Sequence, residues 1–255
     1  MRLTTVGTGT AAPSPTRVNA GHLVELRGVQ LLLDCGSGVV HRMSQLGVDW
    51  MRITHLALTH FHADHTSDVA TLVFGWRYGA MPSRSQPAEI IGPPGTKALL
   101  GKLADCFGTG LREPGFPLTV RELPPGSTLP LAEGVSLEAR KVPHTEESIA
   151  YSVTGGGRRI VYTGDTGLDD SLGEWARQCD VLLAECSLPE EMGMTTHLTP
   201  QQCAALAAAA EPRLLVLTHF YPPVERVDIR AVVAERFGGP VVLAVDGWTT
   251  QVEDD

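Results

Sequence analysis

Aromatic residues and long apolar runs are scarce in this chain of 255 residues. Phe, Trp and Tyr together make up 5% of it. No segment reaches the roughly 20 apolar residues that a membrane-spanning helix needs. The stretch from Met1 to Gly7 also lacks the apolar core of a signal peptide. We therefore expect a cytoplasmic protein that makes no contact with membranes.

Cysteines at the spacing of a disulfide framework are also missing. The five cysteines are scattered, and no two of them form a Cys-x-x-Cys motif. An odd number of scattered cysteines is typical of reduced, buried thiols in a cytosolic protein. The residues concerned are Cys35, Cys106, Cys179, Cys186 and Cys203.

Basic residues are outnumbered by acidic ones. The chain has 20 Lys and Arg against 29 Asp and Glu, which gives a net charge of −9. This balance argues against strong non-specific attraction to nucleic acid or to an anionic membrane. The hydrophobic content of 43% is sufficient for one large domain with a substantial core, or for two small ones.

Secondary-structure patterns recur in the two halves of the chain. Hairpins are predicted at residues 22–33 and 149–163, and in each half strands then alternate with helices. No linker separates the halves. We therefore expect a single domain over residues 1–255 with an α/β (α+β) fold. In this fold two mixed β-sheets pack together and helices flank them, forming an αββα sandwich.

One loop has the composition of a metal site. The segment THFHADH at residues 59–65 follows a short apolar strand and precedes a helix predicted at residues 66–78. His60 and His62 are two residues apart, so they can share one face of an extended chain. Asp64 and His65 follow where the backbone turns, so they can face a second ion. Imidazole together with carboxylate suits zinc or a related divalent metal.

Four more polar residues come directly after, or at the end of, apolar strands. Ligands and catalytic groups at strand ends are expected where a rigid scaffold builds a site along one edge. Each of these residues alone would be interpreted as structural, but together with the 59–65 loop they indicate a shared site. They are His144, Asp165, Glu185 and His219.

These motifs together resemble the metallo-β-lactamase superfamily. The HxHxDH element is followed in order by His144, Gly164-Asp165 and Leu217-Thr218-His219, and the match spans almost the whole chain. Within the superfamily the sequence is most similar to the ribonuclease Z-like branch. The segments that carry this similarity are residues 7–19, Asp34-Cys35-Gly36, Gly164-Asp165-Thr166, Ala184-Glu185-Cys186 and His197-Leu198-Thr199. The resemblance implies the metallo-β-lactamase fold.

The resemblance also implies two divalent metal ions, with zinc favoured and manganese or iron as alternatives. One ion would be held by His60, His62 and His144, and Asp165 would bridge to the other. The ligands of the other ion would be Asp64, His65 and His219. A hydroxide between the two ions would then act as the nucleophile.

The predicted catalytic residues are Asp64, His197 and Glu185. In the family a histidine at the position of His197, supported by a glutamate at Glu185, is thought to protonate the leaving group, which a departing alkoxide requires. The alternative is that His197 only precedes the helix that begins near Thr199. Asp34 and Asp68 are candidates to orient ligand histidines, although Asp68 could instead cap the next helix.

The favoured function is hydrolysis of a small ester, most of all a phosphodiester. The alternative is a ribonuclease Z-type endonuclease acting on the 3′ end of tRNA. The tRNA-gripping arm of that family has no room in residues 149–164, and the net charge is acidic, so tRNA is a disfavoured partner. Arylsulfatase, phosphotriesterase and lactonase activities, or an iron-dependent redox protein, also remain open. Because the branch is often dimeric, a homodimer is among the expectations.

Overall fold

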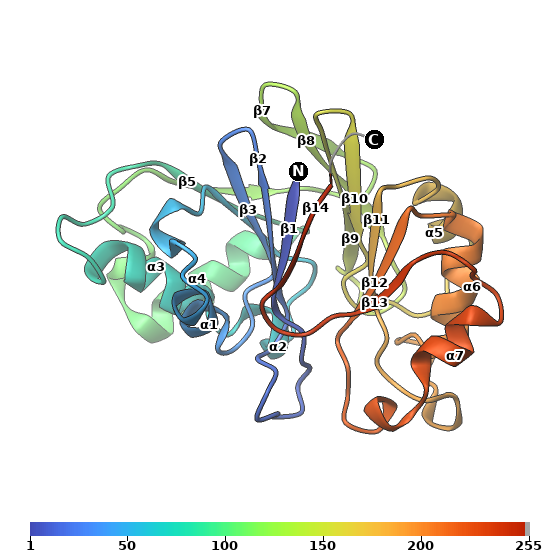
Figure 1. Ribbon diagram of the computed structural model, residues 1–255. Coiled ribbons are helices and arrows are strands. Elements are labelled where there is room, and N and C mark those ends of the chain that lie inside the picture. Colours follow the sequence, from blue (N-terminus) through green and yellow to red (C-terminus); the bar gives the residue numbers. More distant parts are fainter. Residues whose placement is uncertain (253–255) are drawn as a thin grey trace.

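The computed structural model describes residues 1–252, and within them two seven-stranded sheets pack face to face (Figure 1). The strand order of the first sheet is β14-β1-β2-β3-β4-β5-β6, and that of the second is β13-β12-β11-β10-β9-β8-β7. The strands of the first sheet are β1 (Arg2–Gly7), β2 (Gly21–Leu26), β3 (Val29–Leu33), β4 (His55–Ala57), β5 (Ala88–Gly92), β6 (Leu118–Glu122) and β14 (Trp248–Gln251). The strands of the second sheet are β7 (Thr128–Ala132), β8 (Val135–Lys141), β9 (Ile149–Gly155), β10 (Arg158–Tyr162), β11 (Val181–Glu185), β12 (Leu214–Thr218) and β13 (Val241–Leu243).

Helices cover the outer face of each sheet (Figure 1). Those beside the first sheet are α1 (Val39–Gln45), α3 (Val69–Tyr78) and α4 (Thr96–Phe107), whereas α2 (Ala63–Thr66) lies at the end of the strands. Those beside the second are α5 (Asp170–Trp175), α6 (Pro200–Ala210) and α7 (Ile229–Ala234). Short 3-10 turns lie at Trp50–Arg52, Thr109–Leu111, Glu190–Met192 and Val224–Arg226. In the part of the chain that is described, none of the helices has the length and apolar character needed to cross a membrane.

The main core lies between the two sheets. Leu31 and Leu33 of the first sheet belong to the same buried cluster as Leu137, Tyr151 and Val153 of the second. The side chains on the other face of each sheet, such as Leu32 of β3 and Leu182 of β11, pack against the helices in two further clusters. Successive side chains of a strand point to opposite faces of the sheet, so a strand that is apolar throughout contributes to both the main core and the core under the helices. The predicted αββα sandwich of two mixed sheets is confirmed.

Some local predictions need correction. The helix expected at residues 66–78 is two helices, because α2 (Ala63–Thr66) forms a separate turn before α3. Asp64 and His65 therefore lie on a helical turn and not in a loop. The Pro- and Gly-rich region 108–130, whose sequence pattern predicts no regular element, contains β6 and most of β7, and Pro130 is tolerated because β7 is an edge strand. Four cysteines are buried thiols as predicted, but Cys106 is exposed.

Candidate metal centre

The site lies where the strands of both sheets end. The loop after β4 carries His60 and His62, the turn after β10 carries Asp165, and His219 comes directly after β12. β10, β11 and β12 are parallel neighbours, so their carboxyl ends meet at one edge of the second sheet. All seven predicted ligand residues are brought together there, in groups whose potential ligand atoms lie within 4.8 Å of one another.

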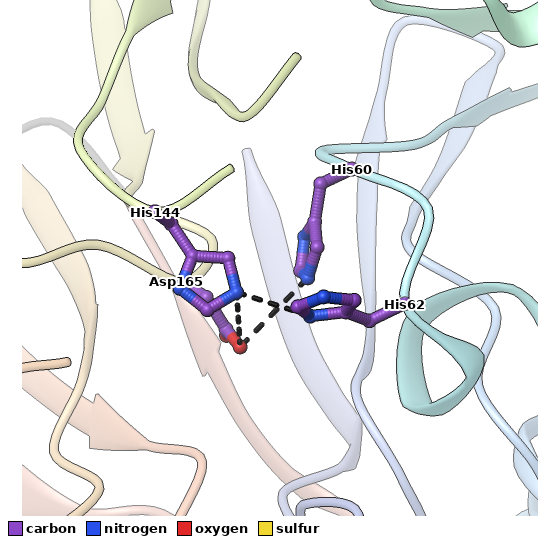
Figure 2. Close-up of side chains that lie close together, drawn as sticks. All are labelled: His60, His62, His144 and Asp165. Carbon is purple, nitrogen blue, oxygen red and sulfur yellow. Dashed lines mark hydrogen bonds and ion pairs between the residues drawn. The ribbon is translucent and has the colours of Figure 1, made fainter. Parts of the chain in front are cut away.

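The first group consists of His60, His62, His144 and Asp165 (Figure 2). His144 Nε2 lies 3.1 Å from His62 Nδ1 and 3.8 Å from Asp165 Oδ2. His60 Nε2 lies 3.9 Å from the same carboxylate oxygen. The three imidazoles and one carboxylate oxygen therefore converge on one point, which suits a divalent ion with an open position.

The second group consists of Asp64, His65 and His219. His219 Nε2 lies 3.3 Å from Asp64 Oδ2, and both His219 Nε2 and His65 Nε2 approach Asp165 Oδ1, at 3.4 Å and 3.2 Å. One carboxylate oxygen of Asp165 thus faces each group. This is the placement that a bridging ligand between two ions requires.

Asp34 fixes the orientation of His65. His65 Nδ1 donates to Asp34 Oδ2 over 2.8 Å, so Nε2 is left for an ion. The same buried carboxylate accepts from the Tyr162 hydroxyl and from the backbone N–H of Thr59, at 2.9 Å and 2.8 Å. The hydrogen-bond acceptor predicted at Asp34 is confirmed. Its φ of 60° is in the left-handed region, which a polar network of this kind can hold in place.

Replacing Asp34 with asparagine is expected to weaken metal binding by about 10- to 100-fold, because His65 would lose a charged acceptor for its Nδ1 proton. A competition titration with a zinc-chelating dye measures this. Asp105→Asn, which removes an exposed carboxylate from α4, is the matched control. Equal zinc affinity in the two variants would refute the orienting role.

Two other predicted ligand histidines also have their Nδ1 atoms held by hydrogen bonds. His144 Nδ1 donates to the carbonyl oxygen of Thr196 over 2.8 Å, and His219 Nδ1 lies 2.9 Å from Ser187 Oγ. Asp68, in contrast, orients none of the ligand histidines. Its carboxylate accepts from the backbone N–H of Val40, at the start of α1, and makes no side-chain cap on α3. Both roles predicted for Asp68 are therefore wrong.

The electrostatics of the cluster fit bound cations. His60 Nε2 is buried and lacks a hydrogen-bond partner among the described residues. An unpaired buried polar group costs about 1–3 kcal/mol, which coordination to a cation would remove. Burial lowers the pKa of His60 well below its usual value, with the positive charge of His65 next in importance, which favours the neutral ligand form. Burial raises the pKa of Asp165, but the charges of His219 and His65 outweigh it and hold that pKa well below the usual range.

His197 lies beside this cluster and pairs with Glu185. Its Nδ1 is 3.1 Å from both carboxylate oxygens of Glu185 and 4.0 Å from Asp165 Oδ2. Its ring is stacked at 6.0 Å from that of His219. Thr199, not His197, caps α6, through a capping box with Gln202. The side chain of His197 is therefore turned toward the metal groups and does not serve the helix.

Sequence reasoning missed Ser187, which touches both Glu185 and His219. A serine two residues after a strand-end glutamate has no distinctive pattern. Its contact with His219 arises only because β11 and β12 are parallel neighbours.

Comparison with known proteins places the chain in a family. Residues 30–220 match the model described as "Beta-lactamase superfamily domain". A ribonuclease Z of Mycobacterium avium is 31% identical, and the alignment covers 99% of each chain. The chain belongs to the ribonuclease Z-like branch of the metallo-β-lactamase superfamily. It is thus a hydrolase of that superfamily whose His/Asp cluster is capable of binding metal.

Solved structures agree with this assignment. The ribonuclease Z-like chain superposes on the short form of human tRNase Z with a TM-score of 0.82 and 27% identity, covering 100% of both chains. It shares its fold with the metallo-β-lactamase fold protein YhfI of Bacillus subtilis, with a TM-score of 0.85, 24% identity and 98% of each chain covered. The predicted superfamily and fold are both confirmed.

Proposed function

We propose that this chain is a metal-dependent phosphodiesterase that cleaves RNA in the manner of ribonuclease Z, at the 3′ end of precursor tRNA. The observation that carries the proposal is the His197–Glu185 pair beside the two metal groups. Relatives named ribonuclease Z, aligned over nearly the whole chain, support it. This ranks RNA cleavage above hydrolysis of small esters, the function that the sequence alone favoured.

In such a reaction some of these residues would bind the metal ions and others would transfer a proton. When bound, two divalent cations would lower the pKa of a water molecule and offset the charge of the phosphodiester. His60, His62 and His144 would hold one ion and Asp64, His65 and His219 the other, with Asp165 between them. The Nδ1 proton of His197 is directed to Glu185, so its Nε2 is the nitrogen that can donate a proton to the leaving oxygen.

A second candidate is hydrolysis of a small phosphodiester. β9 and β10 are joined only by Gly156 and Gly157, which leaves no arm there to grip a tRNA. A cavity of about 330 Å³ is lined by Phe61, Pro94, Pro125, Glu146 and Glu147, and Phe61 lies between His60 and His62 in the chain. Two carboxylates at this place repel a polyphosphate backbone, whereas the apolar walls accept a small aryl or nucleoside group.

One assay separates the two candidates. The zinc- or manganese-loaded protein is incubated with a precursor tRNA that carries a 3′ trailer and, separately, with bis(p-nitrophenyl) phosphate. We expect cleavage of the precursor at one phosphodiester bond, and no cleavage by Asp165→Ala. Hydrolysis of the small diester with the precursor left intact would refute the RNA substrate and favour the second candidate.

A further inference from the structure

The hydroxyl group of Ser187 lies between the proton-donor pair and a metal ligand. Ser187 is fully buried and follows β11 by two residues. Its Oγ donates to Glu185 Oε2 in a short hydrogen bond, and it lies 2.9 Å from His219 Nδ1. Glu185 in turn contacts Nδ1 of His197. A single oxygen atom therefore connects the two parts of the site.

Counting protons assigns the direction of these bonds. A serine hydroxyl carries one proton, and an ionised carboxylate can only accept. The proton of Ser187 has a competing acceptor, the carbonyl oxygen of His219 at 3.2 Å, but the carboxylate of Glu185 is charged and is therefore the stronger acceptor. Oγ must then accept the Nδ1 proton of His219. In the neutral imidazole that a metal ion requires, Nε2 of His219 is then the unprotonated nitrogen, and it faces Asp64 and Asp165 at 3.3 Å and 3.4 Å.

We propose that Ser187 is a positioning residue that holds His219 in the metal-binding tautomer and holds Glu185 against His197. Neither task needs contact with substrate. The backbone supports the same arrangement, because His219 has a φ of 59° and the N–H of Tyr221 donates to the carbonyl oxygen of Ser187 over 3.2 Å. The link to His219 stands by itself, while the effect on proton donation rests on the proposed function.

Three variants test this role. Ser187→Ala removes the hydroxyl without adding volume, and Ser187→Thr restores it. Ser152→Ala is the matched control, because Ser152 is also a buried serine, hydrogen-bonded to Arg159 at a distance from the metal groups. Circular dichroism and a urea unfolding curve establish that each variant is folded.

Two measurements do not depend on activity. In zinc-loaded protein, a hydrogen bond to Oγ protects the Nδ1 proton of His219 from exchange with water. We expect one slowly exchanging imidazole N–H resonance to disappear in Ser187→Ala, and to remain in Ser187→Thr and Ser152→Ala. We also expect zinc affinity to fall by about 10- to 100-fold in Ser187→Ala only.

A third measurement tests the link to proton donation. At saturating zinc, Ser187→Ala is expected to slow cleavage of an unactivated RNA diester more than that of a nitrophenyl diester. Unchanged N–H exchange and zinc affinity in Ser187→Ala would overturn the proposal, as would equal losses in Ser152→Ala. If Ser187→Thr is sterically disturbed, Ser187→Ala and Ser152→Ala decide alone. If the wild-type protein cleaves no diester, the proposed function fails, while the exchange and zinc measurements still judge Ser187.

Discussion

Asp165→Ala is expected to lower kcat/KM by at least about 10³-fold, because its carboxylate would support both ions and several kcal/mol of transition-state stabilisation would depend on them. The carboxylate places one oxygen toward each metal group, at 3.2 Å from His65 and 3.8 Å from His144. Its removal should reduce bound metal as well as activity. Metal analysis by mass spectrometry and a diester assay measure the two effects on the same sample.

The matched control for this change is Asp170→Asn. Asp170 is an exposed carboxylate of the same segment, at the start of α5. Its loss should leave metal content and activity unchanged. If Asp165→Ala keeps two ions per chain and near-normal kcat/KM, the bridging assignment is wrong.

His197→Ala is expected to keep its metal but to lose about 10²- to 10⁴-fold in kcat on an RNA diester, the usual contribution of a general acid. A nitrophenolate leaves without a proton, so nitrophenyl esters should be much less affected. His41→Ala, which removes an exposed histidine from α1, serves as the control. Equal losses on both kinds of ester would contradict the proton-donor role.

The pH dependence gives a second readout of His197. Burial lowers its pKa, but the hydrogen bond to Glu185 and the charge of Glu185 outweigh this and raise the pKa to about 9. An acid is protonated below its pKa, so the rate on RNA should be level near neutral pH and fall on the alkaline side. Bound cations would shift this fall to lower pH. The alkaline fall should be missing in His197→Ala.

The sequence predicted those site residues that are closely spaced in the chain or that lie just after a predicted strand. The segment 59–65 carries four of the predicted ligand residues, and the other three lie within a few residues of strand ends, so neither needed the tertiary structure to be recognised. Parallel order at the end of a sheet then brings Asp165, Glu185 and His219 to one edge. That is why the sandwich and the composition of the cluster could be predicted together.

Features that depend on contacts between distant segments were not predictable. Asp68 binds the start of α1, which lies nearby only after folding. Ser187 gains its partner from the next parallel strand, 32 residues along the chain. The separate turn of α2 places Asp64 and His65 close to His219. Helix propensity is a local property and could not predict this long-range contact.

Each metal group draws its ligands from both sheets. His60, His62, Asp64 and His65 follow β4 of the first sheet, whereas His144, Asp165 and His219 follow strands β8, β10 and β12 of the second. An ion bound in either group would therefore join the two sheets at the end where their strands stop. Because an ion that binds only the folded chain stabilises it by mass action, the free energy of unfolding of this sandwich is expected to rise with the concentration of free metal.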